Sequence, residues 1–322
     1  MAEDRVLIAG SGPVGCVTAL YLAQKGVPVS IFEAEDSLPL DLRASTFHPP
    51  TLDMLEELGV VDALIAQGII CPIWQYRDLE HGIIAEWDLT LLKNDTRHPY
   101  RVQAEQFKLT NIIADILNDM PNVEFQFQAR ATGSSQDADG VNLHLDTPDG
   151  PVTRRGRYLV AAEGASSPIR TDLGIDYSGM TFPEMWLCIS TEYDFGRNFE
   201  NLSPIAYIAD PVFWFVFVKV PGMWRLLMPS FPGETAESLV TDETVRERVA
   251  QVADIGEEYD TYHRTAYHVH QRVAERYREG RVFLAGDSAH INNPLGGMGM
   301  NGGIHDGINL AEKIVAVWRN EA

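Results

Sequence analysis

The sequence has few cysteines, and those it has are widely scattered. Cys16, Cys71 and Cys188 are the three cysteines among 322 residues, and none has the close spacing of a metal site. Sparse cysteine of this kind argues against a disulfide framework and suits a reducing compartment. We therefore expect no disulfides, no bound metal and a cytoplasmic protein.

Positive charge and long apolar runs are also scarce. The chain has 25 Lys and Arg against 46 Asp and Glu, a formal net charge of −21. Such a charge repels nucleic acid and anionic membrane surfaces, so we expect neither as a partner. The apolar stretch over residues 14–23 is too short to span a bilayer, and it predicts a buried helix. With 45% hydrophobic residues, the chain is predicted to bury a large core as two closely packed domains.

The N-terminal segment has the order of elements of a βαβ unit. Residues 5–9 form an apolar run typical of a central parallel strand. Residues 13–25 predict a helix, which Gly26 ends. Residues 29–32 predict a second strand. This order makes a glycine motif between the first strand and the helix credible as a nucleotide site.

That motif is Gly10, Gly12 and Gly15. In a dinucleotide site such glycines allow the tight turn, the close approach of the pyrophosphate and the packing of helix on strand. Glu33 lies at the tip of the second strand, where a carboxylate accepts hydrogen bonds from a ribose. The N-terminal unit therefore predicts a dinucleotide-binding domain, without deciding between NAD and FAD.

Residues 280–309 form the most informative stretch of the chain. A strand over residues 282–285 ends in Gly286 and Asp287, where an α/β sheet usually binds its ligand. A glycine-rich loop follows, and we expect the next helix to begin near Ile304. Glycines let backbone N–H groups approach a flat or anionic ligand, and the helix N-terminus adds partial positive charge.

The region over residues 177–271 differs in pattern from both ends. Its run over residues 213–218 alternates aromatic and β-branched side chains, which indicates a sheet with one face against a core or ligand. Residues 243–253 predict a helix over this sheet. Further patterns predict helices at 51–58 and 106–117, strands at 123–128, 141–145 and 158–162, and a turn-rich segment at 133–140.

Three segments together resemble the fingerprints of the FAD-dependent aromatic hydroxylases of the p-hydroxybenzoate hydroxylase type, the class A flavoprotein monooxygenases. The first is the Gly10 motif. The second is LVAAEGASSPIR over residues 159–170, where Glu163 replaces the family's aspartate. The third is GDSAH over residues 286–290, followed by the proline and glycine loop over residues 294–301.

The resemblance implies an α/β fold with a Rossmann-like FAD-binding domain of the glutathione-reductase type and an inserted, mainly β substrate domain. The FAD-binding domain is expected over residues 1–176, with small substrate-domain excursions near 70–100, and again over 272–322. The substrate domain is expected over 177–271.

The same resemblance assigns roles to individual residues. The flavin-edge loop is expected to act through Pro294, Gly296 and Gly297, with no side-chain nucleophile. The cofactor contacts that it implies are Gly10, Gly12, Pro13, Val14, Gly15, Glu33, Ala34, Arg43, Gln103, Glu163, Asp287, Gly299, Met300 and Asn301.

Substrate contacts are expected from the inserted sheet. We predict Trp214, Phe215 or Phe217 there, and period two allows only one parity of a strand to face the substrate. Tyr207, Trp224 and Met228 could line the same pocket, although aromatic stripes on a sheet are also typical of a plain core. Arg225 could bind a substrate carboxylate through two hydrogen bonds, or form a salt bridge with one of the many acidic residues.

The activity that the resemblance implies is monooxygenation of a small aromatic molecule, either phenol-like or heteroaromatic. NADH or NADPH would reduce the FAD, and O₂ would form a C4a-hydroperoxyflavin that hydroxylates the ring. Two alternatives stay open. One is an FAD-dependent reductase or oxidase of the same fold, and the other a flavin-binding protein whose catalysis is impaired by Glu163 and a short C-terminal segment. A homodimer also stays open.

Overall fold

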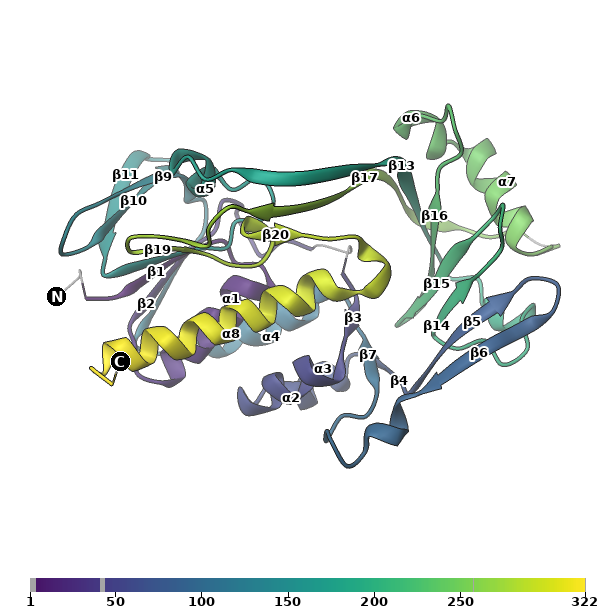
Figure 1. The fold of residues 1–322 in the computed structure, drawn as a ribbon, viewed down its shortest axis with the longest axis horizontal. Coiled ribbons are helices and arrows are strands. Elements are labelled where there is room, and N and C mark those ends of the chain that lie inside the picture. Colours follow the sequence, from purple (N-terminus) through teal and green to yellow (C-terminus); the bar gives the residue numbers. More distant parts are fainter. Residues whose placement is uncertain (1–3, 41–43, 257, 322) are drawn as a thin grey trace.

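Two large sheets organise the chain (Figure 1). The computed structural model describes residues 4–40, 44–256 and 258–321. One sheet has six strands in the order β18-β19-β12-β1-β2-β8, and the other has eight in the order β20-β17-β13-β16-β15-β14-β5-β6. The α/β sheet and the separate β sheet agree with the predicted fold class.

The six-stranded sheet is parallel except for β18 at its edge. Its strands are β1 (Val6–Ala9), β2 (Val29–Phe32), β8 (Val123–Gln126), β12 (Tyr158–Ala161), β18 (Arg278–Glu279) and β19 (Val282–Leu284). All four residues of β1 are buried, because both faces of this sheet are covered. Val6 and Ile8 face the helices, while Leu7 and Ala9 face the opposite cluster beneath β9 (Arg130–Gln136) and β10 (Val141–Thr147).

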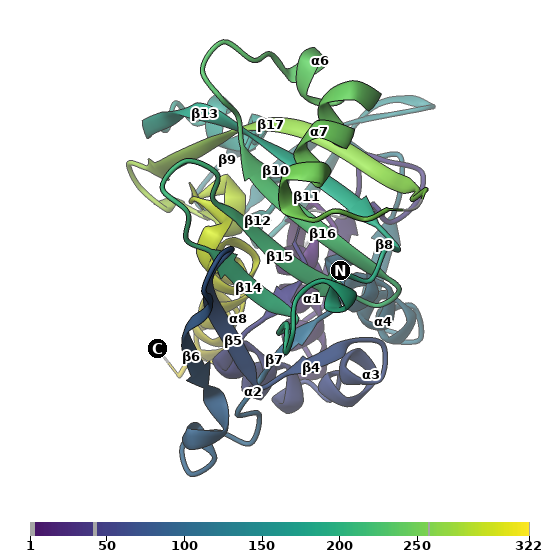
Figure 2. The same ribbon diagram turned by 90° about the vertical axis from the view of Figure 1, so that its right-hand side faces the viewer.

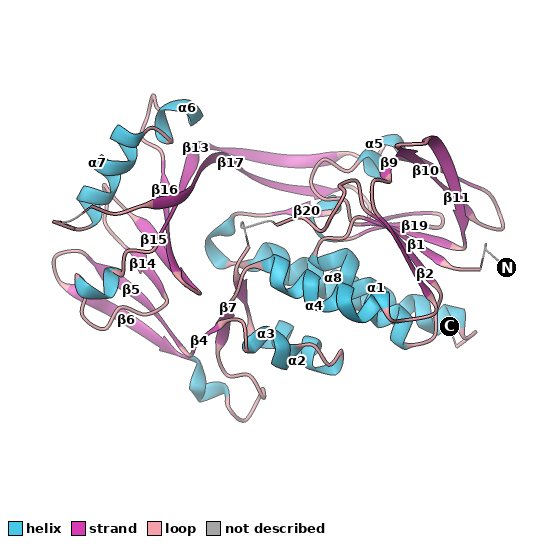
Figure 3. Cartoon of the chain, turned by 180° about the vertical axis from the view of Figure 1, so that it is seen from behind, coloured by secondary structure: helices cyan, strands magenta, loops and turns pink. Residues whose placement is uncertain are grey.

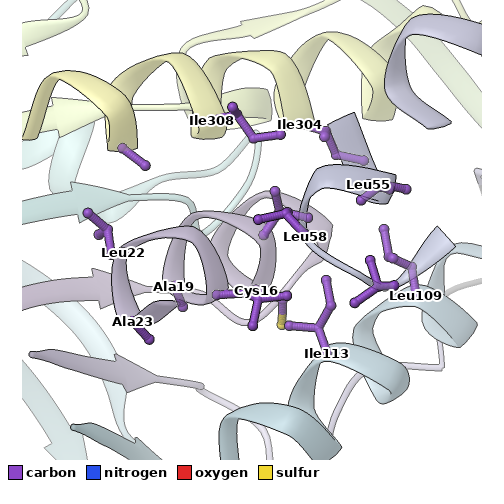
Figure 4. Close-up of a cluster of buried hydrophobic side chains, with 14 of the residues drawn as sticks. Cys16, Ala19, Leu22, Ala23, Leu55, Leu58, Leu109, Ile113, Ile304 and Ile308 are labelled. Carbon is purple, nitrogen blue, oxygen red and sulfur yellow. The ribbon is translucent and has the colours of Figure 1, made fainter. Parts of the chain in front are cut away.

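The helices on one face pack around α1 (Pro13–Gln24). They are α2 (Pro49–Glu57), α3 (Val61–Ile65), α4 (Gln106–Asn118) and α8 (Met298–Trp318). Figure 4 shows Cys16 of α1, Ile113 of α4 and Ile304 of α8 in the apolar cluster between these helices. This cluster fixes the N-termini of α1 and α8 relative to the sheet.

Helix α8 begins at Met298, so the prediction that it begins near Ile304 is wrong. Gly297 adopts a left-handed conformation with φ 64° and lies at the helix N-terminus. Later glycines lie inside the helix because they pack closely on α1. A Cβ at Gly303 would lie 2.7 Å from Val14 Cγ2, and one at Gly307 would lie 2.5 Å from Thr18 Oγ1. Gly303, which we expected to belong to the loop, and Gly307 are therefore explained by the close packing of α8 on α1.

A smaller correction concerns the predicted turn over residues 133–140. Strand β9 runs through its first half, because β10 pairs with β9 on one side and with β11 (Gly150–Gly156) on the other. The remaining short elements are β3 (Thr46–Phe47), β4 (Ile69–Cys71), β7 (Arg101–Gln103), α5 (Pro168–Asp172), η1 (Leu89–Leu92), η2 (Phe195–Arg197), η3 (Gly286–Ser288) and η4 (Pro294–Gly296).

The eight-stranded sheet is assembled from three separate parts of the chain. Its strands are β5 (Ile73–Asp78), β6 (Gly82–Asp88), β13 (Tyr177–Thr191), β14 (Ile205–Ile208), β15 (Phe215–Val220), β16 (Met223–Pro229), β17 (Thr261–Ala274) and β20 (His290–Ile291). The long strands β13 and β17 extend back toward the six-stranded sheet (Figure 1). Strands β5 and β6 come from the segment near 70–100, and β20 comes from the C-terminal part.

Helices cover one face of this sheet, which we call the outer face. Figures 2 and 3 show α6 (Ala236–Leu239) and α7 (Asp242–Val252) on the side away from α8. The inner face looks toward the loop before α8. None of the helices in the described residues is both long and apolar enough to span a membrane.

Candidate functional site

The three motif segments converge on one large cleft with a volume of about 670 Å³. The large cleft lies where β1, β12 and β19 end, between the six-stranded sheet and the inner face of the eight-stranded sheet. The predicted cofactor residues that line it are Gly10, Gly12, Pro13, Val14, Glu33, Ala34, Glu163, Asp287, Gly299 and Met300.

The first motif owes its shape to close backbone contacts. Gly10 has φ 96°, and a Cβ there would lie 2.4 Å from the carbonyl oxygen of Ala162. A Cβ at Gly15 would lie 2.0 Å from the carbonyl oxygen of Gly10, so Gly15 supports the turn from below the cleft. Gly12 is different, because a Cβ there meets no atom within 4 Å. Its open side faces the cleft, where a ligand can approach the backbone.

Two helix N-termini border this cleft. Gly12 precedes α1 and Gly297 precedes α8, and in the described part of the chain no side chain caps either helix. Their first-turn N–H groups lack intrahelical acceptors, which favours an anionic or carbonyl-bearing ligand at both ends.

Glu33 is buried at the end of β2 and is held by a neighbour that the sequence pattern did not indicate. Its Oε2 accepts hydrogen bonds from the backbone N–H of Ser11 at 2.9 Å and from the Ser11 hydroxyl at 2.6 Å. Its Oε1 accepts from the backbone N–H of Glu35 at 3.1 Å. These bonds fix the carboxylate at the rim of the cleft.

Glu163 links the second and third motifs. Its Oε1 accepts from the Ser167 hydroxyl at 2.8 Å and from the backbone N–H of Ile169 at 3.2 Å. Its Oε2 accepts from the Ser288 hydroxyl at 3.2 Å. Burial raises the pKa of Glu163, while these hydrogen bonds act in the opposite direction. The longer side chain therefore binds serine hydroxyl and backbone groups of the second and third motifs.

Arg170 and Tyr177 extend this network under Asp287. Arg170 donates to the carbonyl oxygens of Ser288 at 3.0 Å and Ala165 at 2.7 Å. Its guanidinium lies 3.8 Å from the centre of the Tyr177 ring. The Tyr177 hydroxyl donates to the carbonyl oxygen of Asp287 at 2.8 Å. Backbone contacts thus hold Asp287 at the cleft wall.

A second, smaller cavity of about 50 Å³ lies beside the loop over residues 294–297, and we call it the loop cavity. It contains all three residues predicted for the flavin edge, Pro294, Gly296 and Gly297. Its other walls include Thr46, Arg101, Tyr207, Val216, Val218 and Leu227. Thr46, Val218, Leu227, Pro294 and Gly297 also line the large cleft, so the two spaces adjoin.

Asn301 does not line either cavity but fixes the loop between them. Its Nδ2 donates to the carbonyl oxygens of Gly297 at 2.6 Å and Thr46 at 2.8 Å, and its Oδ1 accepts from the backbone N–H of His48 at 3.0 Å. His48 Nε2 lies 3.1 Å from the carbonyl oxygen of Gly296. Burial and the nearby Arg101 lower the pKa of His48 to about 4, so the ring is neutral at pH 7 and Nε2 can donate this bond.

Gln103 and Arg43 complete the predicted cofactor set. Gln103 is fully buried, and its Oε1 accepts from the Thr46 hydroxyl at 2.8 Å. Its Nε2 is buried and has no hydrogen-bond partner in the described segments. An unpartnered amide donor next to a residue of both cavities fits a site that a polar cofactor completes. Arg43 lies outside the described residues.

The inner and outer faces of the eight-stranded sheet separate the predicted substrate residues. Phe215 and Phe217 are fully buried on the outer face, in a cluster with Trp224, Leu226 and residues of α7. The structure does not bring these two rings to either cavity, because the opposite parity of β15, Val216 and Val218, faces the loop cavity.

Trp214 precedes β15, and its ring makes an edge contact with that of Trp186, which lines the loop cavity, at 5.2 Å between centroids. Of the further candidates for the aromatic pocket, Tyr207 lines the loop cavity, whereas Trp224 and Met228 lie in the outer cluster.

Arg225 lines the large cleft and is buried. Its Nη2 lies 3.7 Å from Glu105 Oε1, and both side chains are at most 5% exposed. The ion pair with an acidic residue, which we considered beside a substrate carboxylate, is therefore present. Glu105 also binds Lys108 at 2.8 Å, which places three charged groups next to the cleft.

Two other polar clusters are formed by residues that do not line these cavities. His290 Nε2 lies 2.6 Å from Asp306 Oδ2, which also accepts from the backbone N–H of Gly286 at 3.1 Å. The bond to Asp306 raises the pKa of His290. Asp53, Glu56 and His98 place potential metal-ligand atoms within 4.8 Å of one another. His98 Nδ1 lies 2.8 Å from Asp53 Oδ1. Because Asp53 belongs to α2, this contact joins the loop that contains His98 to that helix.

Comparison with known proteins agrees with this arrangement. Residues 3–322 match the family model described as FAD binding domain. The chain is 35% identical to para-nitrophenol 4-monooxygenase of Pseudomonas sp. (strain WBC-3), over 99% of this chain and 79% of that protein. It is 32% identical to 6-hydroxy-3-succinoylpyridine 3-monooxygenase of Pseudomonas putida (strain DSM 28022 / S16), over 96% of this chain and 78% of that protein.

Solved structures give the same result. The crystal structure of p-nitrophenol 4-monooxygenase from Pseudomonas putida DLL-E4 has a TM-score of 0.93 at 33% identity, covering 99% of this chain and 81% of that one. Aklavinone-11 hydroxylase in complex with FAD and aklavinone has a TM-score of 0.88 at 28% identity, covering 99% and 63%. The chain therefore belongs to the FAD-binding-domain family, as a class A flavoprotein monooxygenase of the p-hydroxybenzoate hydroxylase type.

Proposed function

We propose that this monooxygenase uses NADH or NADPH and O₂ to hydroxylate a small phenol-like or heteroaromatic molecule that binds at the loop cavity, across its shared boundary with the large cleft. The observation that carries the proposal is that the large cleft and the loop cavity adjoin at Pro294 and Gly297. A flat cofactor in the cleft would end at this loop, with the aromatic substrate on the other side of the same residues. When bound, FAD supplies the activation of O₂.

The residues present fit FAD in both shape and chemistry. Gly10, Gly12, Pro13 and Val14 would hold the pyrophosphate at the N-terminus of α1, and Glu33 would hold a ribose. Asp287 and the first turn of α8, with Gly299 and Met300, would lie along the flavin half. Uncapped N–H groups at α8 stabilise negative charge, which a flavin ring acquires when it is reduced.

The protein's own part in the reaction is to position the ring and to exclude water. Val216, Val218 and Leu227 give the loop cavity an apolar wall, while Asn301 holds residues 294–297 in place. Pro294, Gly296 and Gly297 present backbone without bulky side chains, which permits close approach of two flat molecules. No side-chain nucleophile is needed, because bound FAD would supply the activation of O₂, from which the inserted oxygen atom comes.

The substrate class and cellular setting have separate support. The two relatives described above are named for a nitrophenol and for a hydroxypyridine, so a phenol or a hydroxylated heteroaromatic ring is the first class to test.

Cys16, Cys71 and Cys188 are buried free thiols, which suits the cytoplasm. Trp87 and Leu91 are exposed on the segment near 70–100, and a homodimer would cover such side chains.

The test is a screen of phenols and hydroxypyridines, beginning with 4-nitrophenol, against FAD-loaded protein. We expect a substrate to stimulate NADH or NADPH consumption and, with isotopically labelled O₂, to gain one labelled oxygen atom. A reductase would consume the nucleotide without labelling the product, and an oxidase would release labelled hydrogen peroxide instead. A flavin-binding protein without catalysis would bind FAD and show no stimulated consumption.

A further inference from the structure

One positive charge faces the loop cavity. Arg101 is the one ionised side chain among the described residues that line it, and its guanidinium has no carboxylate partner in the described part of the chain. The Nε atom of Arg101 is buried and has no hydrogen-bond partner there. Four arginines are buried in the described residues. Arg225 pairs with Glu105 and Arg248 with Glu234, whereas Arg77 and Arg170 donate to backbone carbonyl oxygens. A half-buried guanidinium that lacks a carboxylate partner and has a buried, unpartnered Nε favours an anionic ligand.

Aromatic side chains hold Arg101 in this position. Its guanidinium carbon lies 5.0 Å from the centre of the Trp74 ring. The Trp74 ring stacks on the Trp87 ring with 4.1 Å between centroids, and it makes an edge contact with the Tyr207 ring with 5.7 Å between centroids. The Tyr207 hydroxyl donates to the carbonyl oxygen of Leu295, so the aromatic wall is joined to the flavin-edge loop. Arg101 is therefore held beside that loop by contacts that leave its charge unneutralised.

The neighbours of Arg101 show that its charge acts on the cavity. Burial is the main cause of the lowered pKa of His48, and Arg101 lowers it further. Burial raises the pKa of Tyr207, and Arg101 opposes that rise. Both effects have the sign expected of a nearby positive charge.

The remaining walls of the loop cavity are apolar or neutral. Val216, Val218 and Leu227 are apolar, so they add no second positive charge to that of Arg101. The single charge of Arg101 can neutralise a ligand with one negative group but not a dianion. The cavity of about 50 Å³ is smaller than the roughly 150 Å³ that holds a benzene ring. A single ring therefore has to extend through the shared boundary toward the large cleft, and its charged group can stay at Arg101.

We propose that Arg101 binds the ionised oxygen of a monoanionic phenol, so that the enzyme selects the phenolate already present in solution. This inference rests on the proposed function. An ionised oxygen donates electron density into its ring, which favours attack by an electrophilic oxygen. No proton is transferred inside the cavity, since the phenol loses its proton to water before it binds.

The experiment measures binding of 4-nitrophenol to FAD-loaded protein, using the absorption of the phenolate to follow its ionisation. We expect affinity to rise with pH as the free phenol ionises, and the bound form to be the phenolate. Arg101→Met should weaken binding by about 10- to 100-fold, the effect of losing a hydrogen bond to a charged group. Nitrobenzene has the same ring without an ionisable oxygen, and the variant should bind it nearly as well as the parent does.

Two further variants make the result specific. Arg101→Lys keeps the charge and should lose less affinity than Arg101→Met. Arg97→Met removes an arginine that is 73% exposed and paired with Glu56, and it should bind 4-nitrophenol as the parent does. If Arg101→Met does not retain FAD, the comparison of Arg101→Lys with the parent and the ionisation state of bound phenol decide the question.

Each outcome separates this inference from the proposed function. Phenolate binding that is unchanged in Arg101→Met, or a bound phenol that is neutral in the parent, overturns the role of Arg101 and leaves the monooxygenase proposal intact. A parent protein that holds FAD but binds and oxidises no phenol or hydroxypyridine overturns both.

Discussion

The large cleft and the loop cavity meet at Pro294 and Gly297, yet they are built from different parts of the polypeptide. Backbone forms the critical surfaces of the cleft, through glycines in close contact and two uncapped helix N-termini. Side chains from four strands form the wall of the cavity, on one face of a sheet whose other face is a core. FAD affinity should therefore fall when a substitution adds atoms to the glycine turns of the cleft. The choice of substrate should depend on which side chains line the loop cavity.

The largest expected effect comes from crowding the cleft backbone. Gly10→Ala places a Cβ 2.4 Å from the Ala162 carbonyl oxygen at φ 96°, and we expect it to cost at least about 5 kcal/mol and to abolish FAD binding. Gly26→Ala is the matched control, because it has φ 83° and open space around its Cβ. It should cost about 1 kcal/mol. Unfolding in urea and FAD titration measure both, and equal losses would show that close contact is not the cause.

The next effect distinguishes the two faces of β15. Phe217→Ala removes a fully buried ring from the outer core, and we expect a loss of about 3–5 kcal/mol in unfolding free energy. Val218→Ala should cost less stability and change the affinity for aromatic ligands, because Val218 lines both cavities. Urea unfolding and ligand titration on the two variants test this. A change of ligand affinity only in the Phe217 variant would reverse the assignment of faces.

A smaller effect is expected at the ribose position. Glu33→Ala should weaken FAD binding by about 1–3 kcal/mol, because it removes an acceptor fixed by Ser11. Glu35→Ala removes an exposed carboxylate that pairs with Arg130, and FAD affinity should stay as in the parent. Fluorescence titration with FAD measures both, and parent-like affinity in the Glu33 variant would contradict the assigned role.

The smallest effect is a pH dependence at the loop. The pKa of His48 is lowered to about 4 by burial and Arg101, whereas the unfolded chain binds this proton near pH 6.5. The unfolded state therefore binds more protons between these values, so stability is complete above pH 6.5 and falls as the pH falls toward 4. We expect the parent to lose about 1 kcal/mol more than His48→Gln between pH 7 and 5.5. Parallel pH profiles of urea unfolding would argue against a buried neutral ring.

The cleft was predictable because its signals are contiguous in the chain. Gly10, Gly12 and Gly15 lie within one turn, and Glu33 follows at the end of the next strand, so local spacing was enough. The start of α8 was not predictable in this way. Gly303 and Gly307 allow close packing on α1, and their role depends on a helix almost three hundred residues away.

The loop cavity was harder to predict for two physical reasons. Both faces of β15 are apolar, since Phe215 and Phe217 alternate with Val216 and Val218, so the pattern shows a strand without showing which parity meets the ligand. Arg101, Tyr207 and Thr46 come together from separate strands, and no sequence motif joins them. The short element β7, which carries Arg101, also lacks a periodic pattern of its own.

The central claim is that the aromatic substrate binds between Val218 and the loop over residues 294–297. The most direct test is the dissociation constant of 4-nitrophenol for FAD-loaded Val218→Phe, whose larger ring would fill the shared boundary of the two cavities. We expect FAD to remain bound and 4-nitrophenol affinity to fall by about tenfold or more. Parent-like affinity for 4-nitrophenol in this variant would place the substrate elsewhere and contradict the account.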